Sequence, residues 1–382
     1  MIADATLSFE DCFELVDDPR VVGRTTHSLH TVLFIAVAAT IAGADGPEDM
    51  AKFAALKKDW LKQFVDLRNG VPSHDTFGRL LGLIKPKQFQ DAFLMWISSL
   101  ASLQDNDGKP IFIPIDGKTM RGSYSNAEKS DMLHIVSAWA TQQGITLGQV
   151  AVDSKSNEIT AIPQLLEMLE LNGAIVSIDA MGCQREIAAK IVAGQGDYVL
   201  QVKMNQLKLH EAIEASFTEL DTSTADSTTN LVARRRTTRE KSRGREEARH
   251  YTIMQVPESM SSISKKWSNL RSIGRVVREV SRDGKRSCET SYYACSISAK
   301  VRLFSDSVRN HWGIENGLHW VMDVVFGEDR SRIRDGHAAE NMSFLRRFVI
   351  TLLKRDTSKS SLKQKRKEAA WDINFLEKLL FG

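Results

Sequence analysis

The first hundred residues carry apolar side chains at helical spacing, separated by short polar breaks. Residues 28–43 are almost wholly apolar and predict a buried helix. Further helices are predicted over about 47–67, 73–85 and 87–102. Several short helices joined by tight turns suit either a helix-turn-helix DNA reader or a plain helical bundle, and the pattern does not separate the two.

After residue 110 the pattern changes to short apolar runs that alternate with helices. The predicted order is strands at 111–116, 132–140 and 145–153, a helix opened by Pro163, a strand at 174–179, a helix at 185–192 and a strand at 197–203. This order indicates an α/β fold in which helices cover a mixed sheet.

The remaining part of the chain, after residue 203, interrupts this alternation. A helix at 205–220 is followed by a Ser/Thr/Arg-rich loop at 222–245, strand-like runs at 249–256, 271–280 and 291–298, and helices at about 306–325 and 338–354. The pattern predicts three units: a helical N-terminal domain over 1–105, an α/β domain over 106–355 with a β-rich insertion at about 222–305, and a basic C-terminal tail over 356–382. The Lys/Arg-rich stretch 354–368 is expected to be an exposed connector before a short amphipathic end at 371–380.

The composition narrows the class of protein. The 382 residues are 42% hydrophobic and 26% charged, as in folded soluble chains. The four cysteines form no C-x-x-C pair, which disfavours a disulfide scaffold and a thiolate zinc site and indicates a reducing compartment. The longest uncharged apolar run, 32–44, has 13 residues and is too short for a bilayer, so no membrane association is expected and the cytoplasm is the default location.

The positive charge is concentrated in two segments. Residues 234–249 hold eight basic and three acidic side chains, and residues 354–368 hold seven and two, so each segment carries +5. Because the net charge is only +3, the rest of the chain carries about −7. Basic segments on an otherwise acidic chain favour a polyanionic partner. The guanidinium group of arginine can donate two parallel hydrogen bonds to a phosphate, so the arginines favour a phosphate-bearing partner. Two solvated loops without a partner are the alternative.

Two carboxylates stand at the ends of matched apolar strands. Asp116 follows Ile-Pro-Ile, and Asp179 follows Val-Ser-Ile. Sites in open α/β sheets form at the carboxyl ends of strands, so neighbouring strands would bring these carboxylates together. A shared divalent cation, with Mg²⁺ the best fit, would offset their repulsion. A single such Asp more often caps the following turn, but two in matched contexts favour a site.

A third acid, Glu315, lies between two histidines in a predicted helix. His311, Glu315 and His319 fall on one helical face, with Trp312 and Trp320 nearby. A two-cation phosphoryl-transfer site needs a third carboxylate, and Glu315 is the best candidate. A His-x₃-Glu-x₃-His zinc site and a hydrogen-bonded interface are the alternatives.

Basic, amide and aromatic side chains surround these acids and are candidates to bind a phosphodiester backbone. The candidate DNA contacts are Lys118, Arg121, Lys203, Asn205, Arg309, His311, Trp312, Arg332 and Arg334. Each basic residue taken alone is more often a surface charge. Cys183, His134 and His210 are interpreted as structural, because no catalytic partner is evident beside them.

Six segments together resemble the bacterial insertion-sequence transposases of the ISAs type, the group that includes the H-repeat-associated proteins. The segments are VPSHDTFGR at 71–79, IDGKTMRGS at 115–123, KSNEITAIP at 155–163, DAMGCQ at 179–184, DYVLQVKMNQ at 197–206 and HWGIENGLHW at 311–320. The resemblance covers roughly residues 8–353 in order, and an ordered set is more specific than any single motif.

The resemblance implies a ribonuclease-H-like catalytic domain with a DDE triad of Asp116, Asp179 and Glu315. It also implies Mg²⁺, or Mn²⁺ as a substitute, and double-stranded DNA partners, namely the terminal inverted repeats and the target. A homodimer on DNA, in a bacterial cytoplasm and associated with the nucleoid, is expected. Relatives in the wider superfamily carry Tyr, Arg and Lys at fixed offsets from the Glu, where this chain has Val308, His311 and Met322.

The expected function is therefore metal-dependent DNA cleavage and strand transfer at the ends of an insertion sequence. One alternative is an inactive or domesticated DNA-binding protein derived from such an element. Another is a hydrolase that uses two carboxylates, such as a glycosidase, which the basic clusters disfavour and which normally needs no cation.

Overall fold

The computed structural model describes residues 9–21, 23, 25–100, 110–123, 132–152, 157–222, 232–242, 244–282 and 285–382. The helices before the first strand are α1 (Phe9–Phe13), α2 (Leu29–Ile41), α3 (Pro47–Leu56), α4 (Lys58–Leu61), α5 (His74–Leu83) and α6 (Pro86–Leu100). The side chain of Ser28 caps α2, whose residues from Thr31 to Ile41 are all buried. This helix is apolar on every face because it lies inside the N-terminal helical body.

The sheet combines antiparallel and parallel strands. Its strands are β1 (Phe112–Thr119), β2 (His134–Ala140), β3 (Ile145–Val152), β4 (Ile175–Ile178), β5 (Asp197–Val202), β6 (Ala233–Ser242), β7 (Arg245–Gln255), β8 (Ser272–Arg282) and β9 (Lys285–Cys295). They are ordered β3-β2-β1-β4-β5-β9-β8-β7-β6. β1 is antiparallel to β2 and parallel to β4, and β5 is parallel to β4. The expected α/β fold with a mixed sheet is confirmed.

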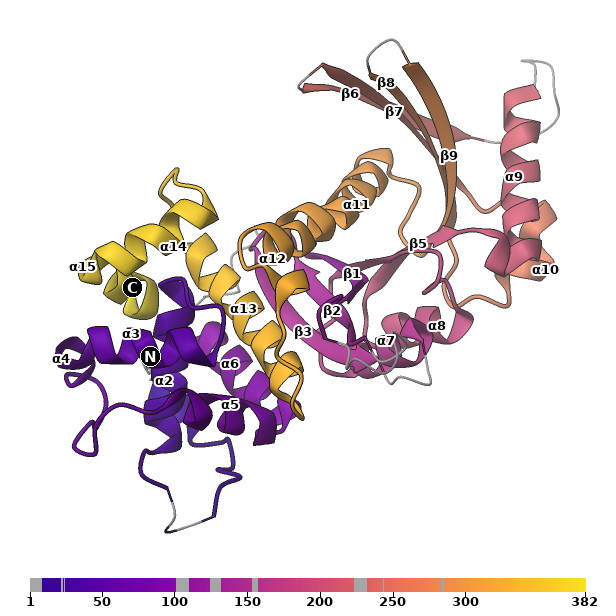
Figure 1. The fold of residues 1–382 in the computed structure, drawn as a ribbon. Helices are drawn as coiled ribbons and strands as arrows, with labels where there is room; N and C mark the ends of the chain where they lie inside the picture. The colour runs from indigo at the N-terminus through magenta and orange to yellow at the C-terminus, as the bar shows by residue number, and fades with distance from the viewer. Residues whose placement is uncertain are drawn as a thin grey trace, which may run out of the picture.

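Strands β6 to β9 extend this sheet rather than form a separate one. β9 pairs antiparallel with β5, and the long hairpins β6–β7 and β8–β9 continue outward as a curved surface (Figure 1). The prediction of a loop over 222–245 is wrong for residues 233–242, which form the edge strand β6. Its charged side chains hide the strand pattern, and its pairing with β7 along the whole strand supplies the hydrogen bonds.

Helices cover both faces of the sheet, as Figure 1 shows. On one face, α7 (Glu158–Glu167), α8 (Arg185–Ala193) and α9 (Leu207–Thr222) pack on a shared apolar cluster. On the other face, α11 (Val301–Ile314) lies against β1, β4 and β5 and beneath β6 and β7. Pro163 was expected to open a helix but lies inside α7, because Asn157 caps this helix six residues earlier through Ile159 N–H.

Short turns connect the remaining elements. They are η2 (Met204–Gln206), η3 (Glu258–Met260), α10 (Ser261–Ser264), the π-helical turn η4 (Glu315–His319), α12 (Trp320–Val324) and η5 (Glu328–Arg330). Together, α11, η4 and α12 form one continuous helical segment from Val301 to Val324.

The C-terminal segment packs back onto the N-terminal helices. α13 (Ala338–Arg355) contacts both β3 and the N-terminal helices, and α14 (Leu362–Trp371) and α15 (Ile373–Phe381) join the same apolar cluster. The expectation that the basic stretch 354–368 is exposed is confirmed for Lys359, Lys363 and Lys367 but wrong for Lys365 and Arg366. Lys365 and Arg366 are buried, where they donate to backbone oxygens that include Leu353 O and Val325 O. The division into domains at 105 and 355 stays a proposal.

Among the described residues, no helix combines the length and the apolar character needed to span a membrane.

Candidate active site

Strands β1 and β4 bring Asp116 and Asp179 to the same place. The strands are parallel and pair Ile115 with Ile178, so the two aspartates occupy the next matched positions. Both line one cavity of about 270 Å³, and Glu315 lines the same cavity. Three acids that lie far apart in the sequence therefore line one cavity, and the matched strands account for Asp116 and Asp179.

Glu315 reaches the cavity because α11 lies tightly on the sheet. Phe304 of α11 is fully buried, and a Cβ at Gly274 of β8 would overlap its ring, so glycine allows the close approach. Glu315 then begins the π-helical turn η4, in which Trp320 N–H donates to Glu315 O. Such turns are frequently found at functional sites.

The two histidines beside Glu315 are neutral in this environment. His311 Nδ1 lies 3.1 Å from Ser177 Oγ, and burial lowers the pKa of His311 to about 4. His319 Nδ1 lies 3.5 Å from Asp116 Oδ2, and burial, followed by the nearby Arg347, lowers its pKa to about 3. Within the described parts of the chain, no three His, Cys, Asp or Glu side chains are close enough together to hold a metal ion.

Burial and neighbouring carboxylates raise the pKa of both aspartates. Burial raises the pKa of Asp116 to about 7, and the charges of Glu158, Asp179 and Glu315 add to the effect, although Gly117 N–H donates to Asp116 Oδ1 at 2.9 Å. Burial also raises the pKa of Asp179, again with a contribution from Glu158. The site therefore concentrates negative charge that a cation would stabilise.

Residues of β7, β8 and β9 in the β insertion also line this cavity. Arg278 of β8 lies over the Trp312 ring, 5.2 Å from its centroid, and its Nε donates to Glu247 at 2.7 Å. Arg249 of β7 also pairs with Glu247. Sequence reasoning missed Arg278, because only the strand register shows which residues of the insertion face the acids.

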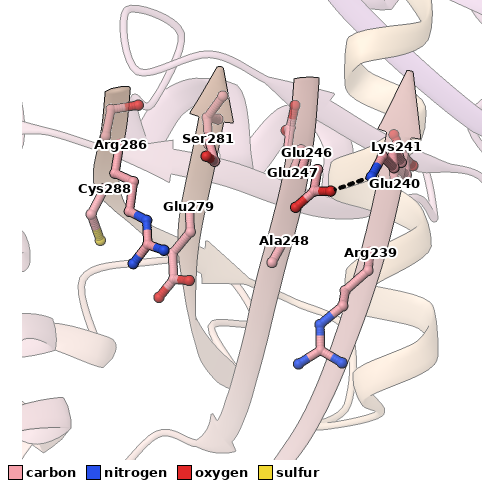
Figure 2. Close-up of a pocket in the computed structure, with 12 residues that line it drawn as sticks. Arg239, Glu240, Lys241, Glu246, Glu247, Ala248, Glu279, Ser281, Arg286 and Cys288 are labelled. Carbon is pink, nitrogen blue, oxygen red and sulfur yellow. Dashed lines mark hydrogen bonds and ion pairs between the residues drawn. The ribbon is translucent and has the colours of Figure 1, made fainter. Parts of the chain in front are cut away.

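A second hollow, of about 790 Å³, lies at the outer end of the insertion (Figure 2). Its walls carry both charge signs, including Arg239, Glu279 and Arg286, and Lys241 donates to Glu246 at 2.6 Å. None of the three predicted acids lines this hollow. Its mixed charge does not select a ligand class.

Comparison with known proteins places this chain in a family. Residues 107–352 match the model of the transposase DDE domain, and residues 10–97 match the model of the DDE_Tnp_1-associated region. This chain belongs to the DDE transposase family. The resemblance stated from the sequence motifs is thereby confirmed.

Curated relatives cover nearly the whole transposase chain. "H repeat-associated putative transposase YhhI" of Escherichia coli (strain K12) is 37% identical over 96% of this chain and 96% of its own length. "Putative transposase YncI" of Escherichia coli O157:H7 is 36% identical over 98% of this chain and 94% of its own length. Among solved structures, the piggyBac transposase synaptic complex with hairpin DNA matches at 10% identity and a TM-score of 0.40, over 98% of this chain and 82% of that chain. Similarity at that level does not define the fold.

The predicted DNA contacts of this transposase fall into different environments. Lys203 is exposed and lines the cavity together with His311 and Trp312. His311 is bound to Ser177 and uncharged, so it does not supply the positive charge of the Arg that relatives carry at this offset. Arg278 lies close enough to Glu315 to lower its pKa, although burial raises that pKa overall.

Lys118 is buried rather than exposed. Its ammonium group lies 2.7 Å from Asp323, 3.1 Å from Asp329 and 3.6 Å from Glu328. These three carboxylates hold it charged, so a structural role is the better interpretation of Lys118.

The other predicted contacts lie outside the cavity, and most have protein partners. Arg309 pairs with Glu240 at 2.7 Å, and Asn205 Nδ2 donates to Ala180 O at 2.6 Å. Arg121 lies 3.7 Å from Asp329, Arg334 Nε donates to Gly122 O at 3.2 Å, and Arg332 is exposed. The loop after β1 and the segment after η5 therefore lie side by side.

Glu158 is a neighbour of the acids that sequence reasoning did not single out. It starts α7 directly after the cap Asn157, and it lies in the motif at 155–163, whose first two residues are outside the described parts of the chain. The motif at 155–163 was the only sign in the sequence that pointed to Glu158. The sequence separation of Glu158 and Asp116 does not predict that they are close in space.

Proposed function

We propose that this transposase uses Asp116, Asp179 and Glu315 to cleave DNA and transfer strands at the ends of an insertion sequence. The observation that carries the proposal is that three acids from separate segments, two of them on matched strands, line one cavity. Acids so arranged, beside cationic groups, suit phosphoryl transfer better than glycoside hydrolysis.

The strand arrangement supports a ribonuclease-H-like core. In the order β3-β2-β1-β4-β5, the first three strands are antiparallel, and β4 and β5 run parallel to β1. Helices cover both faces, and the β insertion enters after β5 and before the helix that leads to Glu315. Asp179 directly follows β4, whereas Asp116 lies within β1, which continues to Thr119 along β2 rather than ending at the acid. The two aspartates lie where the pairing of β1 with β4 ends.

The donor set fits divalent cations, with Mg²⁺ or Mn²⁺ as the proposed ions. Carboxylate oxygens are the ligands that these ions prefer, and the mutual repulsion of the acids is relieved by positive charge. When bound, such ions activate the attacking water or 3′-hydroxyl and stabilise the leaving 3′ oxygen.

The chain's own residues would bind and orient the DNA. Lys203 and Arg278 present positive charge to a phosphate at the cavity, and the Trp312 ring limits how the backbone enters. The exposed Arg332 extends the basic surface beyond β1. The N-terminal helices are proposed to bind the terminal inverted repeats, and two protomers to hold two ends, in a bacterial cytoplasm at the nucleoid.

The test is strand cleavage of DNA that carries the flanking inverted repeats, with and without Mg²⁺. Wild-type protein is expected to cleave only with the cation. Glu315→Gln is expected to lose cleavage while it keeps DNA binding, and Glu258→Gln, an exposed acid of the insertion, serves as the matched control. Full activity of Glu315→Gln would overturn the proposal. End binding without cleavage by the wild-type protein would favour the alternative of an inactive, domesticated DNA-binding protein.

A further inference from the structure

The basic segment 354–368 has no part in the proposed active site, and α14 divides its charges between two sides. Lys365 and Arg366 lie on the buried side of this helix, together with Ala369. The exposed side chains of α14, called here the α14 face, are Lys363, Gln364, Lys367 and Trp371. Because a helix turns once in about 3.6 residues and rises about 1.5 Å per residue, positions 363, 367 and 371 follow one another along one side over about 12 Å.

The buried side fixes α14 to the rest of the protein. Lys365 Nζ donates to Leu353 O, near the end of α13, at 3.1 Å. Arg366 donates to Val325 O, directly after α12, at 2.7 Å, and to Thr40 O of α2 at 3.2 Å. The α14 face is therefore held in one orientation, and it belongs to the same body as the helical segment that carries the third acid.

The charge of the α14 face is not balanced by carboxylates. Within the described parts of the chain, the side chains of Lys363 and Lys367 form no ion pair or hydrogen bond, and neither does that of Lys359, which is exposed just before the helix. The residue four positions after each of these lysines is another lysine or Trp371. Like charges at this spacing are unfavourable for the helix itself, so an anionic partner accounts for them better than helix stability does.

Trp371 is the second unusual feature of the α14 face. Its side chain is 71% exposed, and among the described residues it makes no ring contact. Tryptophan is highly buried on average, so this ring offers apolar area to a partner. Surfaces that bind nucleic acid combine basic side chains for the phosphates with aromatic rings that pack on the chain between them. A membrane-bound helix would instead expose a whole apolar side, whereas the apolar side of α14 is buried.

We propose that the α14 face, together with Lys359, binds the backbone of duplex DNA outside the cavity of the three acids. None of these side chains lines that cavity. The inference rests on the proposed function for the identity of the anionic partner, and it adds a surface that contacts phosphates without reading bases. Each lysine that neutralises a phosphate releases counterions, so binding through this surface weakens steeply as salt is added.

The experiment measures binding of the full chain to labelled, end-containing duplex DNA by fluorescence anisotropy, without Mg²⁺, between about 0.05 and 0.2 M salt. One variant combines Lys363→Gln with Lys367→Gln, and a second is Trp371→Ala. The matched control combines Lys265→Gln with Lys266→Gln, which removes the same charge from two exposed lysines of the β insertion.

The two variants are expected to differ in their response to salt. Lys363→Gln with Lys367→Gln should weaken binding by about tenfold or more at about 0.1 M salt and reduce the slope of log affinity against log salt by about 1.8, since each phosphate contact contributes about 0.9. Trp371→Ala should weaken binding by about fivefold or more and leave the slope unchanged, because it removes no charge. The control pair is expected to keep the affinity and slope of the wild type.

Four outcomes would overturn the inference. These are an unchanged slope in the Lys363→Gln, Lys367→Gln variant, an equal loss of slope in the control pair, and a loss of slope in Lys363→Arg with Lys367→Arg, which keeps the charge. The fourth is binding to vesicles of anionic phospholipid that the Gln variant loses while its DNA affinity stays unchanged, which would assign the face to a membrane. Because the substituted side chains are exposed and unpaired, the melting temperature is expected to stay within about 5 °C of the wild type.

The proposed function is tested by a different result. Full cleavage by Glu315→Gln would overturn the proposed function and would leave the salt slopes as they are. Loss of cleavage in Glu315→Gln, with equal salt slopes for the wild type and the Lys363→Gln, Lys367→Gln variant, would overturn only the role of the α14 face.

Discussion

Replacing Lys354 by Met removes a contact that ties α13 to the turn carrying Glu315. Lys354 Nζ donates to Gly317 O at 3.1 Å, inside the π-helical turn that begins at Glu315. The same ammonium group lies 4.3 Å from the centroid of the Trp139 ring. Met fills a similar volume but offers neither the donor nor the charge.

The opposing contributions of Lys354 to stability nearly cancel. A hydrogen bond from a charged donor contributes about 1.5–3 kcal/mol, and a cation–π contact about 0.5–2 kcal/mol. Against this, burial lowers the pKa of Lys354 from 10.5 to about 8, which corresponds to a cost of about 3 kcal/mol for the charged form. Lys354→Met is therefore expected to change the free energy of unfolding by less than about 2 kcal/mol.

Cleavage is expected to respond more than stability does. Without the bond to Gly317 O, the turn can return to α-helical geometry, which would rotate Glu315 relative to Asp116. A loss of about tenfold or more in end cleavage is expected. Urea unfolding and strand cleavage, measured on the same preparations, give the two quantities.

The pH dependence gives a second check on Lys354. Because its pKa is lowered in the folded state, the unfolded chain binds more protons between about pH 8 and 10.5. The stability of the wild type relative to Lys354→Met should therefore rise with pH across that window. Unchanged cleavage in the Met variant, or a stability loss above about 4 kcal/mol, would refute the reasoning.

Three further changes test the packing around the site. Asp356→Asn leaves the buried Lys365 ammonium, 3.1 Å away, without its counter-ion, and should lower the free energy of unfolding by about 3–5 kcal/mol in urea titrations; a loss below about 1 kcal/mol would contradict this. Phe304→Ala removes the buried ring that packs α11 against the sheet and should lower the free energy of unfolding by about 3–5 kcal/mol in the same assay. Full stability would show that other contacts hold α11 in place. Gly117→Ala should displace Glu158 and lower the free energy of unfolding in the same assay, and unchanged stability would speak against that contact.

The sequence predicted the parts of the fold that follow from apolar periodicity. Two short apolar runs that each end in Asp are enough to place Asp116 and Asp179 at one sheet edge, since parallel strands share a direction. Glu315 was found through its helical neighbours His311 and His319. Local pattern was sufficient in these places because each acid directly follows an apolar run or lies on the marked face of a helix, although β1 itself continues past Asp116 to Thr119.

The features that the sequence did not predict depend on tertiary contacts, and each of them involves charged side chains. The sequence of strand β6 predicts a loop, because its side chains are largely Arg and Thr. Its strand conformation depends on the hydrogen bonds with β7. Arg366 reads as solvated, but buried carbonyl oxygens accept its hydrogen bonds. Glu158 and Arg278 reach the acids from elements that no spacing rule relates to Asp116. In each case, strand register or helix packing decides the outcome.

The central claim is that acids from separate segments act as one catalytic unit, and a double-mutant comparison tests it most directly. The rate of end cleavage is measured for wild type, Asp116→Asn, Glu315→Gln and the double variant, at equal DNA occupancy. The account predicts that each single change lowers the rate by on the order of 10³-fold or more, and that the double variant is no slower than the singles. A single variant that cleaves at nearly the wild-type rate, or losses that multiply in the double variant, would contradict it.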